Sequence, residues 1–324
     1  MTRLRDAAPF QAATLETLPG NLKGGTVAIG NFDGVHLGHQ KVLEEAMAIG
    51  RPAVALTFEP HPRTFFGADP PVYRLTPPNA RARVMAAMGL DGLVVAPFDR
   101  ALASLSADAF VRDVLLDRLK VKAVVVGGDF HYGARRSGTA QTLAEAAATY
   151  GFSTTAVDGV GDDHGPISST RIRTLLSDGD VAGAAECLGY RHQIVEEVIH
   201  GEKRGRTMGY PTANQSLPAN CRLRHGIYAV RAHTGDQWRD GVASFGRRPT
   251  FDNGRPLLET FIFDYAGDLY GQVLPITLCA YLRPEMAFSS MDALVEQMDA
   301  DSANAKAALS ALTPLSPLDE ALNF

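Results

Sequence analysis

The hydrophobic pattern of the chain changes its period near residue 190, and this change limits the possible folds. Up to about residue 185, short runs rich in β-branched residues alternate with longer segments of helical period. Strands are expected at 26–32, 53–58, 93–97, 123–126 and 154–157, and helices at 108–120 and 139–150. Because strands that alternate with helices form parallel sheets, this half predicts a doubly wound α/β domain.

Beyond residue 190 the hydrophobic residues recur at every second position, which is typical of strands with one buried face. Strands are expected at 193–200, 226–233, 238–244, 259–263 and 273–282, followed by a helix at 290–312. A compact antiparallel β-barrel with a terminal helix fits this series. We therefore expect two domains, residues 1–187 and 188–324, with the last dozen residues as a loosely held tail.

Six prolines interrupt the α/β rhythm between residues 59 and 79. Proline at this density breaks helices and central strands, so the segment predicts a long ordered loop. Such a loop can act as a lid over a binding site, and a plain surface insertion is the alternative.

The formal net charge of −5 argues against a surface that binds nucleic acid. Basic residues nonetheless gather beside glycines, as at 135–136 and 203–206, and this placement favours small anionic ligands such as nucleotides. The three cysteines are far apart in the sequence, which fits a reducing compartment. Since no apolar stretch approaches the length of a membrane span and no signal peptide is recognisable, we expect a cytoplasmic protein without a membrane partner.

A glycine-rich turn, G-N-F-D-G-V-H-L-G-H at residues 30–39, follows the first expected strand. Glycines between a strand and a helix let backbone N–H groups face a bound anion. His36 and His39 lie three residues apart at the expected helix start, so both rings can reach the charge that develops on a transferring phosphoryl group. Two alternatives stay open: a metal site with Asp33 and His61 as further ligands, and histidines that only cap and pack.

The pattern G-x-F-D-G-x-H-x-G-H resembles the first signature of the nucleotidyltransferases that include FMN adenylyltransferase. Residues 167–173, I-S-S-T-R-I-R, are similar to the second signature of that family. The resemblance implies a Rossmann-like fold in which His36 and His39 are catalytic. It also implies an ATP and phosphate site formed by Gly30, Asn31, Phe32, Asp33, Gly34, Gly38, Ser168, Ser169, Thr170, Arg171 and Arg173.

Two further segments match the same family. A glycine turn at 126–133 carries Asp129 and Phe130, and F-E-P-H-P at 58–62 carries His61. The resemblance implies that these three residues belong to the flavin and nucleotide pocket of the adenylyltransferase half. A simple turn role for Asp129 is the alternative.

The barrel half carries a basic segment punctuated by glycines at 201–214, which ends in P-T-A-N at 211–214. This segment is similar to the ATP segment of riboflavin kinase, and a solvated hairpin loop is the alternative. The hydroxyl of Thr212 and the carbonyl of Asn214 are hard oxygen donors that suit Mg²⁺. The resemblance implies ATP-binding roles for Gly201, Lys203, Gly205, Arg206, Gly209, Pro211 and Thr212, and flavin-binding roles for Arg283, Glu285 and Phe288.

Glu259 matches the position of the kinase family's general base, which accepts the proton of a ribityl hydroxyl. A glutamate in a strand usually faces solvent, so this role rests on the resemblance. The chain departs from the family two residues later, where Phe261 stands in place of the usual histidine. If that histidine only packs, phenylalanine is tolerated, whereas if it tunes the base, the kinase half is slowed.

Together the two resemblances extend over residues 20–312 and imply a bacterial-type bifunctional riboflavin kinase and FAD synthetase. Such an enzyme phosphorylates riboflavin to FMN with MgATP and then adenylylates FMN to FAD, releasing pyrophosphate. Three alternatives remain: a chain with one working half, a nucleotidyltransferase with another acceptor, and a flavin-sensing module without catalysis. The sequence predicts no oligomeric state.

Overall fold

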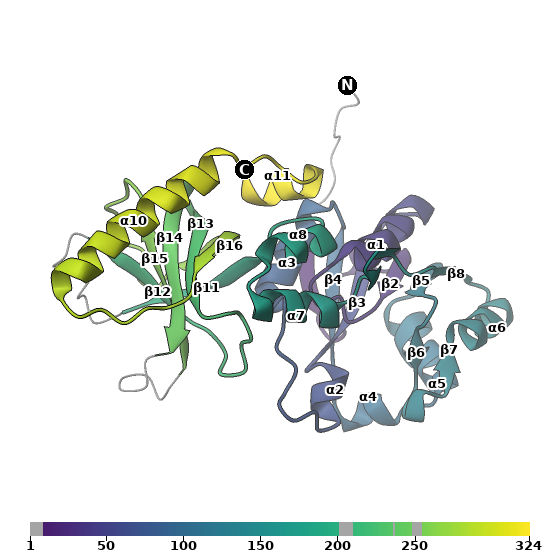
Figure 1. Ribbon diagram of the computed structural model, residues 1–324. Helices are drawn as coiled ribbons and strands as arrows, with labels where there is room; N and C mark the ends of the chain where they lie inside the picture. The colour runs from purple at the N-terminus through teal and green to yellow at the C-terminus, as the bar shows by residue number, and fades with distance from the viewer. Residues whose placement is uncertain (1–8, 201–209, 236, 248–254) are drawn as a thin grey trace. The chain divides into compact units, whose positions relative to one another are not determined.

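The computed structural model describes residues 9–200, 210–235, 237–247 and 255–324 (Figure 1). The chain divides into two compact units, Met1–Arg74 with Arg81–Ser168, and Leu75–Ala80 with Ser169–Phe324. The helices α7 (Ser169–Asp178) and α8 (Val181–Leu188) are grouped with the second unit. A domain boundary between residues 187 and 188 stays a prediction.

The first unit is built on a parallel sheet of six strands in the order β1-β4-β3-β2-β5-β8. The strands are β1 (Gln11–Thr14), β2 (Thr26–Ile29), β3 (Ala53–Glu59), β4 (Gly92–Pro97), β5 (Ala123–Gly127) and β8 (Ser153–Val157). This confirms the doubly wound sheet. The chain runs from β2 to β3 on one side and returns to β5 on the other, so the strand order reverses between β2 and β5.

The helices of this unit follow the expected alternation. They are α1 (Leu37–Ile49), α2 (Pro62–Phe65), α3 (Pro78–Ala87), α4 (Arg100–Ser104), α5 (Ala107–Ala109), a π-helix (Phe110–Arg118) and α6 (Ala140–Tyr150). Thr139 forms a capping box at the start of α6, and left-handed Gly151 ends it. The apolar sides of the π-helix and α6 pack with β2, β3, β4 and β5 into one buried core. Two short hairpins complete the unit: β6 (His131–Tyr132) with β7 (Gly138–Thr139), and β9 (Gly161–Asp162) with β10 (Gly165–Pro166).

The strand predicted at 26–32 is too long, because the extended backbone ends at Ile29. Phe32 (φ 47°) and Val35 (φ 39°) have left-handed backbones, which a β-strand cannot contain. The apolar side chain of Phe32 made the sequence look like a continuing strand. The residue is instead buried within the glycine-rich turn, with 1% of its surface exposed.

The second unit contains a closed antiparallel barrel of six strands in the order β11-β12-β15-β14-β13-β16, which confirms the predicted barrel. The strands are β11 (Gln193–Ile199), β12 (Thr212–Ser216), β13 (Gly226–Thr234), β14 (Gln237–Arg247), β15 (Pro256–Ile262) and β16 (Val273–Arg283). The strand list drawn from the sequence lacks β12, because its residues, T-A-N-Q-S, are mostly polar.

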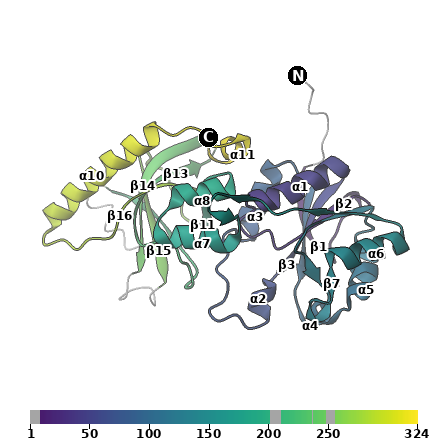
Figure 2. The same cartoon turned by 45° about the vertical axis from the view of Figure 1, so that its right-hand side comes forward.

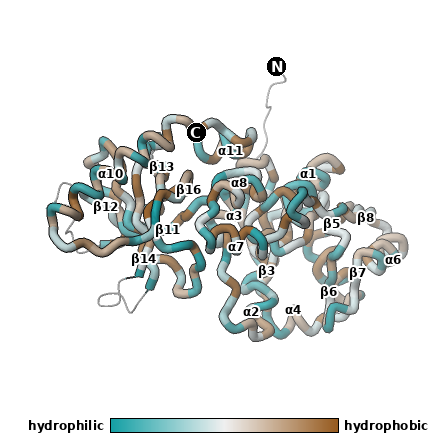
Figure 3. The backbone as a smooth tube through the Cα atoms, in the orientation of Figure 1, coloured by the Kyte–Doolittle hydropathy of each residue, from teal (hydrophilic) through white to brown (hydrophobic). Residues whose placement is uncertain are grey.

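Helix α10 (Met291–Ser310) lies along the outside of the barrel, as two views show (Figures 1 and 2). Its Ala305 and Leu309 pack into an apolar cluster with Ala229 and Phe263 of the barrel. The helix alternates hydrophilic and hydrophobic residues along its length (Figure 3). None of the helices in the described part of the chain is both long and apolar enough to cross a membrane.

The expectation of a loose tail is wrong, because the chain ends in a docked helix, α11 (Pro317–Asn323). Asp319 is fully buried and forms an ion pair with Arg191, while its Oδ1 accepts from Asn323 Nδ2 at 2.6 Å. Gln193 of β11 donates to the Leu322 carbonyl at 2.9 Å. Polar side chains anchor this helix, and hydrophobic periodicity therefore gave no sign of it.

Candidate active sites

The glycine-rich turn connects β2 to α1 at the carboxyl end of the sheet, beside the point where the strand order reverses. Open α/β sheets bind their ligands at this place. Two of its residues with side chains, Phe32 and Val35, have positive φ angles, a backbone state that costs about 1–3 kcal/mol each. Such strain persists only where surrounding contacts hold it, and it gathers at functional sites.

The two predicted catalytic histidines lie together at the start of α1. His36 is the N-cap residue, and its Nδ1 accepts from the His39 backbone N–H at 3.4 Å, which leaves the proton on Nε2. The two rings are stacked, with centroids 3.7 Å apart and planes 20° apart. A Cβ on Gly38 would lie 3.2 Å from Cε1 of His36, so a glycine makes room for this ring.

Burial keeps both imidazoles neutral. It lowers the pKa of His36 to about 4, and it lowers the pKa of His39 well below its ordinary value, with further repulsion from His36 and Arg81. Nδ1 of His39 is buried and has no hydrogen-bond partner among the described residues. The pair can therefore donate hydrogen bonds to an anion at neutral pH without carrying a charge of its own.

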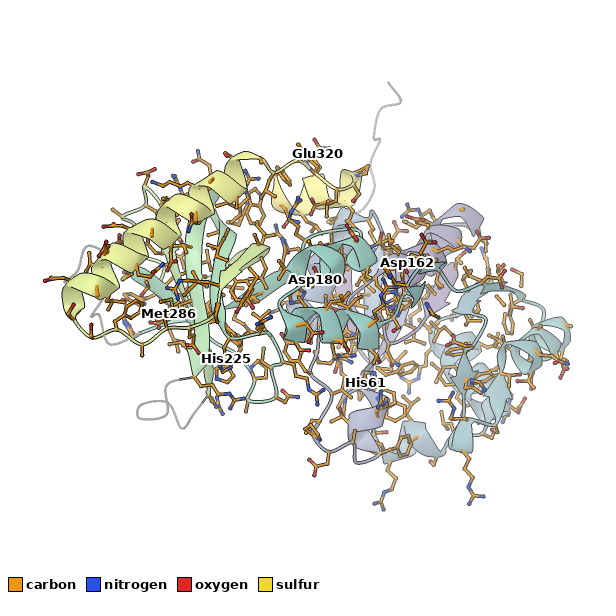
Figure 4. The ribbon with its side chains drawn as sticks, in the orientation of Figure 1. His61, Asp162, Asp180, His225, Met286 and Glu320 are labelled. Carbon is orange, nitrogen blue, oxygen red and sulfur yellow. The ribbon has the colours of Figure 1, made fainter. Side chains whose placement is uncertain are left out.

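The alternative of a metal site finds no support in the described ranges, where no group of three or more His, Cys, Asp or Glu residues could hold an ion. His61 caps α2 instead, since its Nδ1 accepts from the Arg63 backbone N–H at 3.1 Å (Figure 4). Asp33 is buried, with 1% of its surface exposed.

The residues of the predicted flavin pocket follow β3 and β5, the two strands that flank β2 in the sheet. His61 comes after β3, and Asp129 and Phe130 come after β5. Asp129 is exposed, whereas Phe130 stacks on Tyr132 with ring centroids 5.6 Å apart. Since both strands end at the same edge of the sheet, all three residues lie at the edge where the glycine-rich turn begins.

A chain of aromatic rings, which the sequence reading missed, extends along this edge. Phe65 at the end of α2 is 38% exposed, Phe66 directly after it is 70% exposed, and both contact Phe98 edge to face. The contacts continue inward through Phe58, Phe110 and Tyr132 to Phe130. The sequence signal of this chain of rings was an aromatic residue near the end of each of three strands: Phe58 in β3, Phe98 after β4 and Phe130 after β5.

Along the chain, the division between the two units falls within the second nucleotidyltransferase motif. Ser168 ends the first unit, and Ser169 begins α7 of the second. Thr170, Arg171 and Arg173 lie in the first turns of this helix. The two halves of the predicted ATP and phosphate site thus belong to different compact units.

In the barrel, Glu259 of β15 lies opposite Asn214 of β12 on one side and Ser244 of β14 on the other. Residues that face each other across strands point to the same side of a sheet. The alternate residues of β15, such as Thr260, are fully buried inside the barrel, so Glu259 and its two partners share the outer face. The register alone brings the predicted base and a predicted metal ligand together.

Asn214 is suited to the ligand role predicted for it. It is only 5% exposed, and its Nδ2 donates to the Thr212 carbonyl at 3.3 Å. Its Oδ1 is buried without a hydrogen-bond partner in the described ranges. A buried carbonyl oxygen without a donor costs free energy, which a cation or an ordered water can recover.

Phe261 has a packing role. Its ring lies 4.8 Å from the ring of Tyr210 and 5.7 Å from that of Phe263, and it joins the apolar cluster under α10. It also lies opposite Thr212, two pairs along the register from Glu259 and Asn214. An aromatic side chain fills this position without leaving a buried polar group unpaired.

The three predicted flavin-binding residues differ in their surroundings. The guanidinium of Arg283 is held by Asp301 of α10 through bonds of 2.8 and 2.6 Å. Glu285 is exposed and lies against the backbone of Gly246, where a Cβ would come within 2.0 Å of its Oε1. Phe288 is half-buried in the segment before α10.

Nδ1 of His225, which is labelled in Figure 4, lies 3.5 Å from Oε2 of Glu285. Pro211 is exposed and directly precedes β12. The other predicted ATP ligands of the kinase, Gly201, Lys203, Gly205, Arg206 and Gly209, lie outside the described residues.

Comparison with known proteins gives a consistent result. A family model described as FAD synthetase matches residues 19–171, and one described as riboflavin kinase matches residues 188–309. A protein of Escherichia coli (strain K12) named bifunctional riboflavin kinase/FMN adenylyltransferase is 38% identical, over 88% of this chain and 92% of its own. A protein of the same name from Haemophilus influenzae is also 38% identical, over 88% and 94% of the two chains.

A solved structure shares the fold and much of the sequence. It is titled macrolide-efflux protein from Streptococcus pneumoniae, is 31% identical, and matches with a TM-score of 0.76 over 91% of this chain and 96% of its own. The two family models and the relatives of similar length agree on one assignment. The chain belongs to the family of bifunctional riboflavin kinases and FMN adenylyltransferases.

Proposed function

We propose that this chain makes FAD from riboflavin in two steps. The barrel phosphorylates riboflavin with MgATP to give FMN and ADP. The residues of the adenylyltransferase half then transfer AMP from a second ATP to FMN, giving FAD and pyrophosphate. Membership of the family supports both activities. A cytoplasmic location fits the use of ATP and stays a prediction. That the chain's partners are small molecules only also stays a prediction.

In the second step an FMN phosphate oxygen attacks the α-phosphorus of ATP, and the bond from this phosphorus to the bridging oxygen of pyrophosphate breaks. Negative charge gathers on the departing pyrophosphate. We assign its stabilisation to the glycine-rich turn, whose N–H groups and helix α1 form an anion site. The Nε2–H of His36 and the ring of His39 supply donors, so the stacked neutral pair is the observation that carries this half.

Stabilising a developing charge with fixed donors is commonly the largest contribution to catalysis. Phe65 and Phe66 offer exposed rings at the same edge of the sheet and are suited to hold the flat flavin ring. Arg171 and Arg173 carry charges that match the outer phosphates of ATP.

In the first step Glu259 takes the proton of the terminal ribityl hydroxyl as that oxygen attacks the γ-phosphorus of ATP, and ADP leaves. The Oδ1 of Asn214 and the hydroxyl of Thr212 would hold Mg²⁺, which neutralises charge on the phosphates when bound. The cross-strand pairing of Glu259 with Asn214 is the observation that carries this half.

One experiment tests both halves together. The purified chain is incubated with riboflavin and MgATP, and the flavins are resolved by chromatography. FMN appearing first and FAD afterwards is the expected result, while bound riboflavin without product would favour a flavin sensor. Glu259→Gln should stop FMN formation and leave conversion of supplied FMN to FAD intact, and His36→Ala with His39→Ala should do the reverse. Loss of both activities in either variant would contradict separate sites.

A further inference from the structure

A buried arginine, Arg81, donates a hydrogen bond to the backbone of the glycine-rich turn. Arg81 of α3 is 0% exposed, and its Nη1 donates to the Asn31 carbonyl at 2.9 Å and to Thr57 Oγ1 at 2.9 Å. The Thr57 hydroxyl itself donates to the Asn31 carbonyl at 3.0 Å. Arginine is almost never fully buried unless it is paired, and Nη2 of Arg81 forms an ion pair with Glu59.

The turn requires such support. Asn31 is followed directly by Phe32, the first of the two left-handed residues with side chains. The carbonyl of Asn31 accepts from side chains of two other elements, Thr57 of β3 and Arg81 of α3. These contacts fix the direction of the peptide from which the strained backbone begins.

The same carboxylate reaches a second segment. Glu59, the last residue of β3, also forms an ion pair with Arg74. Residues 59 and 74 bracket the part of the proline-rich segment that carries Phe65 and Phe66. The Glu59 carboxylate thus lies between two guanidinium groups. It links the proline-rich segment, through Arg74, to Arg81, which supports the glycine-rich turn.

We propose that Arg81 is a positioning residue for adenylyl transfer, which holds the Asn31 carbonyl and so fixes His36 and His39 in their stacked arrangement. The inference rests on the proposed function of this site. Arg81 touches no substrate in this role. Its planar guanidinium bonds a carbonyl, a hydroxyl and a carboxylate at once, which the single ammonium of lysine cannot do in the same geometry. Its charge also opposes protonation of His39.

The test compares four variants for conversion of supplied FMN to FAD. Arg81→Gln removes both the charge and the planar guanidinium, whereas Arg81→Lys keeps the charge. Thr57→Val removes only the hydroxyl that helps to hold the Asn31 carbonyl. Arg112→Gln is the matched control, because it removes another guanidinium from the same unit, in an exposed pair with Asp108. Circular dichroism and the amplitude of FMN binding report how much of each variant is folded.

A reacting group misplaced by about 1 Å can cost about 100-fold in rate. We expect kcat per folded chain to fall about 10- to 100-fold in Arg81→Gln and less in Arg81→Lys and Thr57→Val. The KM values for FMN and MgATP should stay within about threefold of the parent. A purely structural role would lower the folded fraction and leave kcat per folded chain unchanged.

An Arg81→Gln protein that folds and turns over within twofold of the parent would overturn the inference, as would an equal loss in Arg112→Gln. If neither Arg81 variant folds, Thr57→Val decides, and parental kcat there overturns the inference. A parent chain that makes no FAD from FMN and MgATP fails at an earlier point, because that result overturns the proposed function itself.

Discussion

The stacked imidazoles of His36 and His39 should stay uncharged across the pH range in which the chain would work. Burial lowers the pKa of His36 from 6.5 to about 4, and only 7% of the residue is exposed. At pH 7 the imidazolium form of His36 is then present at about one part in a thousand, since each pH unit above the pKa changes the ratio tenfold.

The assay is an NMR titration of the imidazole Cε1–H signals in the free chain between pH 8 and pH 4. His36→Asn assigns the His36 signal by removing it, and the chain in urea supplies the unfolded reference, which should titrate near pH 6.5. The His36 signal should be constant down to about pH 5 and move only below it. A non-hydrolysable MgATP analogue should shift this midpoint upward, because negative phosphates favour the imidazolium.

The lowered pKa of His36 also determines how the free energy of unfolding depends on pH. Between pH 6.5 and pH 4 the unfolded chain binds a proton at residue 36 that the folded chain excludes, so stability falls as the pH falls. The loss is about 3 kcal/mol over this window and is absent above it, since one pKa unit corresponds to about 1.4 kcal/mol. A midpoint for His36 above about pH 5.5 in the free chain would refute the reasoning, because a solvated imidazole could then act as a charged donor.

Three further predictions concern the barrel, whose unfolding the chain's single tryptophan, Trp238, reports by fluorescence. Burial also lowers the pKa of His192 to about 4, so His192→Leu should remove about 3 kcal/mol of the stability loss between pH 6.5 and pH 4, and parallel pH curves would contradict this. Asp319→Ala leaves a guanidinium buried without its carboxylate and should cost about 3–5 kcal/mol in urea unfolding, whereas a loss below about 1 kcal/mol would show that the pair contributes little. Phe261→His should change kinase kcat by less than about threefold, because Phe261 packs against aromatic rings, and a tenfold gain would show that the family histidine tunes the base.

The hydrophobic pattern was enough to predict both fold classes. The parallel strands are continuous β-branched runs, and the barrel strands alternate, because one kind is buried on two faces and the other on one. The pattern failed where polar side chains build an element. β12 is mostly polar, and α11 is held by Asp319 and Asn323, so hydrophobic periodicity had no signal in either segment.

The residues of the candidate sites also differ in whether the sequence could predict them. His36 and His39 were predictable because both lie within ten residues of one motif. Arg81 was not, because it lies 50 residues from Asn31 in the sequence and meets it only after β3 and α3 have packed. Nothing in its local sequence distinguishes it from an exposed arginine of a helix, and a contact of this range becomes visible only in the folded chain.

The two candidate sites therefore depend on the fold in different ways. In the barrel, the backbone register alone sets Glu259 opposite Asn214, so substitutions elsewhere should reach that site mainly through global stability. The glycine-rich turn has no partner strand beyond Ile29, and side chains such as Arg81 and Thr57 must hold its carbonyl in place. Substitutions that touch no substrate should thus reduce adenylyl transfer more readily than riboflavin phosphorylation. The difference arises because a parallel sheet binds ligands with the loops at its edge, whereas this barrel site is built within paired strands.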